Sequence, residues 1–183
     1  GVITAAGARQ GVIVDARGWR GLVELSQVLG TEIGNGVKGQ AALLDLARPG
    51  AAQLFAEGLH VVPHLDGTVA IGSTSERYFK SPDQTDGQLD DLIAKAKRLF
   101  PELRCAAVIE RWAGVRPRGF TRAPMLGQHP VHSDWFIANG GFKIGFGMAP
   151  KIAQVMTALI LDGEDQIPDD FRAAASLRRK NDT

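Results

Sequence analysis

The chain places a glycine-rich loop directly before a long apolar helix, in residues 139–163. Glycines at 140, 141, 145 and 147 let the backbone approach a ligand with no Cβ in the way. Pro150 suits a first helical position, because its φ is already set and it has no N–H to leave unpaired. We therefore expect a helix that begins near Ala149 and has free N–H groups beside the loop. The alternative is a turn that only lets the helix pack closely on a strand.

Composition excludes several classes of protein. With 183 residues, 44% of them apolar and 22% charged, the chain can form one domain or two lobes with a real core. A net charge of +1 gives no field that would hold nucleic acid or an anionic membrane. Cys105 is the single cysteine, which excludes an internal disulfide and favours a cytoplasmic location. No apolar run reaches the roughly 20 residues that a membrane-spanning helix needs.

Periodicity in the first half predicts strands and a helix in alternation. Two β-segments should meet at a turn around Ala6-Gly7, and the second, Val12–Val14, reads as a buried strand. Residues 22–29 have helical spacing and end at Gly30, a natural C-terminal cap. A strand is expected at 37–46. A hairpin follows at 59–74, with Asp66-Gly67 forming a two-residue turn.

The second half continues this mixed pattern. An amphipathic helix over 89–100 should stop at Pro101, and strands are expected at 105–114 and 135–139. The last helix should bury one side, and the tail after Pro168 reads as loosely attached. The expected buried side consists of Ile152, Val155, Met156, Leu159 and Ile160.

Arg116 is the clearest candidate for binding a substrate. It stands in "ERWAGVRPRG", residues 110–119, where Arg116-Pro117 is expected to end the strand. A guanidinium at a strand end can bind a carboxylate through two parallel hydrogen bonds. Arg118 and Arg122 are interpreted as surface residues, which is the commoner fate of arginine.

The four histidines do not form a known metal pattern with any cysteine or carboxylate, so no metal site is expected. His64, His129 and His132 lie near turns or in loops and are interpreted as solvent-facing. His60, on the inner approach of the hairpin, is the one histidine with an expected functional role.

Five segments together resemble the C-terminal part of the flavin-dependent D-amino acid oxidase family. The resemblance is closest to the glycine oxidase branch, whose members also act in thiamine biosynthesis. It implies an α/β (mixed α+β) fold, with parts of an FAD-binding domain at 1–30 and 128–165. The substrate-binding domain would cover 31–127, and 166–183 would be a C-terminal tail. The segments are "VKGQ" (37–40), "HVVPHLDGTVAIGST" (60–74), "AKRLFPEL" (96–103), "RWAGVRP" (111–117) and "GGFKIGFGMAPKIAQVMTALI" (140–160).

The resemblance also implies roles for individual residues. Arg116 falls on the family's substrate-carboxylate arginine, His60 on a position that often holds a cavity-lining tyrosine, and Lys143 on an arginine of glycine oxidases. The last helix would point its N-terminus at the flavin. The residues implied to contact FAD are Ala16, Arg17, Gly18, Gly140, Gly141, Phe142, Lys143, Ile144 and Gly145.

The implied activity is oxidative deamination of a small amino acid or amine, with hydride transfer to FAD and release of imine and hydrogen peroxide. Three departures from the family pattern make the substrate an open question: His60, Gly140-Gly141 in place of Gly-His, and Ile144 in place of asparagine. Two other functions stay open, a non-catalytic binding module and a flavin dehydrogenase that uses an acceptor other than oxygen.

The chain has no GxGxxG motif after an N-terminal strand, the motif that holds the FAD pyrophosphate. It also opens at Gly1 without an initiator methionine. We therefore expect a separate N-terminal half or a second chain to complete the protein, and little FAD bound by these residues alone.

Overall fold

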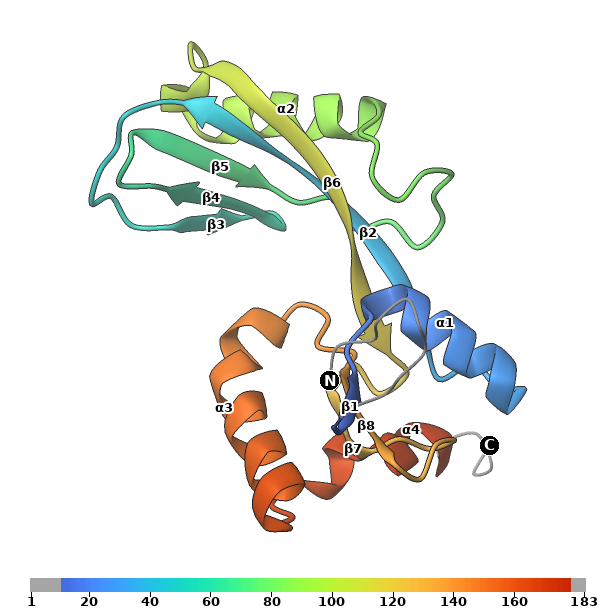
Figure 1. The fold of residues 1–183 in the computed structure, drawn as a ribbon. Coiled ribbons are helices and arrows are strands. Elements are labelled where there is room, and N and C mark those ends of the chain that lie inside the picture. Colours follow the sequence, from blue (N-terminus) through green and yellow to red (C-terminus); the bar gives the residue numbers. More distant parts are fainter. Residues whose placement is uncertain (1–10, 179–183) are drawn as a thin grey trace. The chain divides into compact units, whose positions relative to one another are not determined.

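The computed structural model describes residues 11–178 and has the expected mixed α+β architecture (Figure 1). The described residues form two compact units: unit 1 contains residues 11–36 and 116–178, and unit 2 contains Val37–Val115. The expected turn at Ala6-Gly7 lies outside the described residues. Residues 116–127 therefore belong to unit 1 and not to unit 2, and the strand over 125–128 pairs with another strand of unit 1.

Unit 1 is built on a three-stranded sheet in the order β1-β8-β7. Strand β1 (Ile13–Asp15) pairs in parallel with β8 (Trp135–Asn139), and β7 (Met125–Gln128) pairs antiparallel with β8. Residues alternate between the two faces of a strand. Helix α1 (Gly18–Leu29) packs on the face of Met125 and Ile137, while α3 (Gly145–Thr157) packs against Leu126 and Phe136.

Strand β1 differs from the buried strand that its apolar sequence predicts. Val12 and Val14 are 41% and 40% exposed, whereas Asp15 is buried. In the described sheet β1 is an edge strand with one neighbour, β8. Its apolar residues therefore keep an open side, which a fully enclosed parallel strand would not have.

Unit 2 contains a five-stranded sheet in the order β3-β4-β5-β2-β6. The pairings β3–β4, β4–β5 and β5–β2 are antiparallel. The expected hairpin is confirmed, but its loop has four residues, 64–67, and Gly67 alone of them has a positive φ, 88°. The strand bounds are β2 Gly34–Asp45, β3 Leu54–Ala56, β4 Leu59–Pro63, β5 Thr68–Gly72 and β6 Ala107–Gly119.

Helix α2 (Gly87–Leu99) supplies the helical side of the unit 2 core. Asp86 caps its first turn by accepting a hydrogen bond from the Gln88 amide at 3.0 Å. Leu89, Ile93 and Ala96 are buried at helical spacing against strands β4 and β5. A 3-10 turn follows at η1 (Pro101–Leu103), so Pro101 ends the helix as expected.

Two elements extend further than the sequence predicts. Helix α3 begins at Gly145, not Ala149, and contains Pro150; the Met148 amide donates to the Ile144 carbonyl at 3.0 Å in its first turn. Strand β6 continues past Arg116-Pro117 to Gly119. It can do so because β6 is an edge strand, where a proline need not donate to a neighbour on the open side.

The end of the described chain is packed, contrary to the expectation of a loosely attached tail. After α3 come a π-helical segment η2 (Ala158–Asp162), a 3-10 turn η3 (Asp169–Phe171) and α4 (Ala173–Arg178). Ile167 and Ala173 are buried in the two apolar clusters of unit 1. The predicted inner side of the last helix, including Val155 and Met156, is confirmed. No helix within residues 11–178 is long and apolar enough to cross a membrane.

A buried polar network joins β2 to the segment before α2. The Lys38 side chain is 2% exposed, and its Nζ lies 3.6 Å from Glu76 Oε2 and 3.7 Å from Asp86 Oδ2. Gln40 Nε2 donates to the other oxygen of each carboxylate, at 2.9 Å and 2.8 Å. Glu76 Oε2 has no hydrogen-bond donor of its own, so Lys38 is the charge that compensates it.

Replacing Lys38 by alanine should destabilise the protein by about 3–5 kcal/mol, because Glu76 would stay buried without its compensating charge. Lys95→Ala is the matched control, since Lys95 pairs with Glu57 at the surface, where such a pair contributes under about 1 kcal/mol. Urea unfolding measures both values. Equal losses in the two variants would contradict the role given to Lys38.

Candidate functional site

Unit 1 contains a cavity of about 420 Å³ where the glycine-rich loop meets α3. One wall comes from the chain after β1, one from the end of β8 and the loop after it, and one from the side of α3. The cavity is lined by Ala16, Gly18, Pro117, Ala138, Asn139, Gly140, Gly141, Phe142, Gly145, Ala149, Ile152, Ala153 and Met156.

The parallel pairing of β1 and β8 explains why these segments meet. Both strands run in the same direction, so Asp15 and Asn139 end at the same edge of the sheet. In open α/β sheets a ligand binds just beyond the carboxyl ends of the strands. The turns that leave this edge contain Gly18 and Gly140, with φ values of 68° and 75° that other residues rarely adopt.

Two helices begin at the cavity. Gly18 is the first residue of α1 and Gly145 the first of α3, and both residues line it. Neither N-terminus is capped by a side chain, and neither first turn contains an acidic residue. The partial positive charge of both helix ends is therefore available to a ligand that is negatively charged or gains electrons.

The glycine-rich loop is held close to its surroundings by the backbone. The Phe142 amide donates to the Pro117 carbonyl at 2.9 Å, and Arg118 forms an isolated antiparallel bridge with Gly141. A Cβ on Gly141 would lie 2.7 Å from the Gly145 Cα, which is too close for any side chain. Glycine at 141 is thus required for the loop to fold back onto the start of α3.

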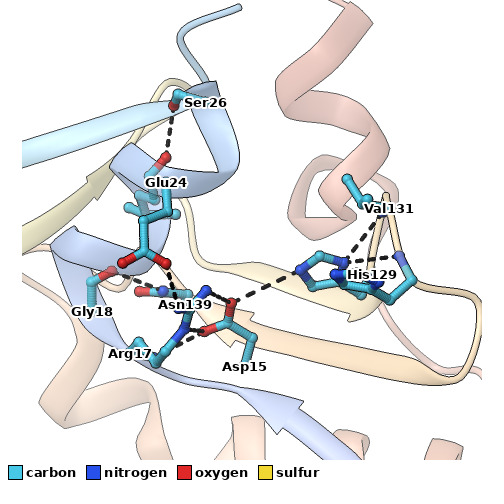
Figure 2. Close-up of polar contacts among 10 residues, drawn as sticks. Asp15, Arg17, Gly18, Glu24, Ser26, His129, Val131 and Asn139 are labelled. Atoms are coloured by element: carbon cyan, nitrogen blue, oxygen red, sulfur yellow. Dashed lines mark hydrogen bonds and ion pairs between the residues drawn. The ribbon is translucent and has the colours of Figure 1, made fainter. Parts of the chain in front are cut away.

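Asp15 and Arg17 fix the turn between β1 and α1 (Figure 2). Asp15 Oδ1 accepts from the Arg17 amide and from Nε, both at 3.1 Å, and Oδ2 accepts from the guanidinium at 2.9 Å. Burial alone would raise the pKa of Asp15, but the hydrogen bonds and charge of Arg17, with a smaller contribution from His129, lower it below the usual value. The carboxylate therefore stays ionised and anchors Arg17.

His129 is buried, which corrects the expectation that it faces solvent; His132 is exposed and His64 is half-buried. His129 Nδ1 accepts hydrogen bonds from the amides of Val131 and His132, each at 3.2 Å. Nδ1 must therefore be unprotonated, and the neutral ring carries its proton on Nε2, which lies 3.8 Å from Asp15 Oδ2 (Figure 2). Burial, and then the neighbouring His132, lower the pKa of His129 despite the nearby Asp15.

The structure brings six of the nine predicted FAD contacts to the cavity wall: Ala16, Gly18, Gly140, Gly141, Phe142 and Gly145. Arg17, Lys143 and Ile144 are adjacent in sequence but do not line it. Lys143 is exposed, with Nζ 5.8 Å from the centre of the Phe142 ring. Arg116 is half-buried in β6 beside Pro117. His60 lies on β4 of unit 2 and is exposed, with its ring centre 4.5 Å from that of Phe55 and the two rings tilted by 40°.

Several lining residues were not predicted from the sequence. Those on α3 follow a helical repeat on one face and could have been found from that spacing, since an apolar stripe beside a glycine-rich loop indicates a covered surface. They are Ala149, Ile152, Ala153 and Met156. Asn139 carries no such signal, because its contacts depend on residues distant in the sequence.

A family model described as FAD dependent oxidoreductase (DAO) matches residues 1–159. The chain belongs to this family. It is 35% identical over 170 residues to the glycine oxidase of Pseudomonas putida, covering 90% of this chain and 46% of that protein. It is 32% identical over 173 residues to the glycine oxidase of Pseudomonas aeruginosa, covering 92% of this chain and 47% of that protein. The resemblance inferred from the sequence is confirmed, and the chain spans about half the length of the curated relatives it matches.

Solved structures of an oxidase and a dehydrogenase share this fold. Glycine oxidase from Geobacillus kaustophilus superposes with a TM-score of 0.75 at 22% identity, over 92% of this chain and 47% of that one. L-Proline dehydrogenase from P. horikoshii superposes with a TM-score of 0.81 at 19% identity, over 96% of this chain and 50% of that one.

The cavity of this member of the FAD dependent oxidoreductase family has features that fit part of an FAD molecule. Gly18 and Gly145 both line the cavity, and a Cβ added at either would meet no protein atom within 4 Å. The α3 wall is apolar and can pack against the face of a planar ring system, and the two helix N-termini favour a group that gains negative charge on reduction.

Protein stability should fall as the pH is lowered below about 6.5, the ordinary pKa of histidine. Because the folded-state pKa of His129 is lowered, the unfolded chain binds a proton first, so the contribution of His129 is complete above that pH and is lost on acidification. Asp15, whose pKa is also lowered, adds a loss of the same sign at more acidic pH. Urea unfolding at a series of pH values measures the slope.

His129→Gln should flatten the slope just below pH 6.5, because glutamine has no group that titrates there. An identical pH profile for wild type and His129→Gln would contradict this assignment.

Proposed function

We propose that the protein containing this chain is a flavin-dependent oxidase that converts a small amino acid or amine into its imine, with oxygen reduced to hydrogen peroxide. The observation that carries the proposal is the cavity of unit 1, where two uncapped helix N-termini and a glycine-rich loop meet. Family membership and the glycine oxidase relatives support the same chemistry.

The residues proposed to hold FAD are those that shape the cavity. Ala16 and Gly18 would contact it from the turn after β1, and Gly140, Gly141 and Gly145 from the loop before α3. Bound FAD would supply the electron acceptor for a hydride from the substrate Cα–H bond. The helix that begins at Gly145 would stabilise the added charge through its N-terminal dipole.

Arg116 is proposed to bind the substrate carboxylate. It immediately precedes Pro117, which lines the cavity and whose carbonyl accepts from Phe142. Because β6 is extended through Gly119, the backbone at 116 is fixed within a strand, not in a mobile loop. A guanidinium on a rigid element can hold a carboxylate by two hydrogen bonds and so orient the Cα–H bond.

His60 and Lys143 are proposed to determine substrate choice. Lys143 presents a point charge where the resemblance implies a forked guanidinium, and the imidazole of His60 is smaller than a phenol. Both side chains are exposed in their own units, and the exposed Lys143 lies beside the lining residue Phe142. A substrate larger or more acidic than glycine would suit these groups.

The pyrophosphate of FAD is proposed to be held by residues outside this chain, either in a further segment of the same protein or in a second chain. The absence of a GxGxxG motif from the sequence supports this. A cytoplasmic location, favoured by the single cysteine, stays a prediction.

The proposal is tested with the purified complete protein. Flavin absorbance with one FAD per protein, and peroxide released in air with an amino acid, are the expected results. Flavin reduction without peroxide would indicate a dehydrogenase with another acceptor. A protein that neither binds FAD nor oxidises any amine would overturn the function.

Arg116→Ala should lower kcat/KM for carboxylate substrates by about 30- to 900-fold, which corresponds to about 2–4 kcal/mol for a lost charge-assisted pair. Arg111→Ala is the matched control, an exposed arginine of the same strand that pairs with Asp90 at 2.7 Å. Steady-state kinetics of both variants measure the effect. An unchanged KM for every carboxylate substrate in folded Arg116→Ala would disprove the role.

Glycine should be a poor substrate compared with bulkier or acidic amines, because Lys143 and His60 differ in charge and size from the residues that the resemblance implies at these two positions. A panel of amino acids and amines, compared by kcat/KM, measures this preference. Lys143→Arg should shift the preference toward glycine. Glycine as the best substrate of the unmodified protein would show that the two positions do not set specificity.

A further inference from the structure

Asn139 connects the two loops that frame the cavity, and it does so from a buried position. It is the last residue of β8, is 8% exposed and lines the cavity. Its Nδ2 donates to the Gly18 carbonyl at 3.0 Å, and its Oδ1 accepts from the Gly140 amide at 2.8 Å. Figure 2 shows the amide of Asn139 beside Gly18 and the Asp15–Arg17 pair.

The orientation of this amide is fixed by its partners. The Gly18 carbonyl can only accept and the Gly140 amide can only donate, so turning the side chain over would oppose like groups on both sides. The bond to Gly18 joins residues 121 positions apart in the sequence, and the bond to Gly140 joins neighbouring residues. A single side chain therefore links the turn after β1 to the loop after β8.

Both connected residues have backbones that need such support. Gly18 and Gly140 have positive φ values, and glycine is the residue that loses most conformational freedom when it is ordered. Each also belongs to a proposed FAD-contacting segment: Gly18 lies at the N-terminus of α1 and Gly140 at the start of the glycine-rich loop.

The packing of α1 leaves room for this arrangement. A Cβ on Gly21 would lie 3.1 Å from Asp15 Oδ1 and 3.5 Å from Asn139 Nδ2. Glycine at 21 therefore allows the first turn of α1 to approach the Asn139 amide and the Asp15 carboxylate together. This close approach brings the Gly18 carbonyl within hydrogen-bond distance of Asn139.

We propose that Asn139 is a positioning residue for the cofactor, which holds the turn at Gly18 and the loop at Gly140 at the separation that FAD requires. The inference rests on the proposed function, because the ligand that benefits is FAD. In the protein without ligand, Asn139 keeps the Gly140 amide protected and both loops in their binding geometry. FAD then binds to loops that are already ordered, and less conformational entropy is lost on binding.

The test compares FAD binding to wild type, Asn139→Leu and Asn139→Asp in the complete protein, measured by quenching of flavin fluorescence. Leucine is similar in size and removes both hydrogen bonds. Aspartate keeps an acceptor for the Gly140 amide but cannot donate to Gly18. We expect the dissociation constant of FAD to rise about 10- to 100-fold for leucine, as for two lost buried hydrogen bonds. The aspartate variant should also bind FAD more weakly than wild type. This comparison is made at high salt, where the added negative charge is screened and the lost hydrogen bond accounts for the difference.

Hydrogen exchange in the ligand-free protein supplies a second measurement. The Gly140 amide should exchange faster in Asn139→Leu and stay protected in Asn139→Asp, which a general loss of stability would not produce. Asn35→Leu is the matched control, a strand asparagine of unit 1 that donates to Glu32 and does not line the cavity. It should change neither measurement.

The outcomes are distinguishable. Wild-type protein that does not bind FAD would overturn the proposed function and this inference with it. Wild-type protein that binds FAD, with a folded Asn139 variant that binds it equally well, would overturn the positioning role alone. Should the leucine variant fail to fold, the aspartate variant decides by the same criterion.

Discussion

The parallel pairing of β1 with β8 is the contact on which the candidate site depends. It joins residues near the start of the chain to residues more than a hundred positions later, in register Ile13 to Trp135 and Asp15 to Ile137. Because both strands end at one edge, the turn to α1 and the loop to α3 leave the sheet together. The cavity, its two helix N-termini and the bridging amide of Asn139 all follow from that pairing.

The charged groups at this edge of the sheet are of two kinds: side chains that pair with one another, and helix N-termini that can interact with a ligand. Asp15 and Arg17 neutralise each other, and the buried His129 stays neutral with its proton directed toward Asp15. No acidic side chain occupies the first turn of α1 or α3. The positive ends of two helix dipoles therefore remain for a cofactor that gains charge on reduction.

Unit 2 contains a buried charged network of its own. Its core is an ordinary sheet-and-helix contact, but Lys38, Gln40 and Glu76 lie beneath the segment that leads into α2. Such a network is costly to desolvate, and it is tolerated because each polar group has a defined neighbour. It couples β2 to the N-terminal cap of α2 through Asp86, which accepts from both Gln40 and the Gln88 amide.

Elements whose signals are local could be predicted from the residues alone. The hairpin around Asp66-Gly67, the helix ending before Pro101, the Gly30 cap and the glycine-rich loop at 140–147 all depend on neighbours within a few residues. The other features depend on contacts between segments that are distant in the sequence. Strand β6 passes through Pro117 because it lies at a sheet edge, His129 is buried because Asp15 and Trp135 pack around it, and Asn139 acts through Gly18, 121 residues away. Such contacts form only when distant segments meet, so no local pattern of residue types specifies them.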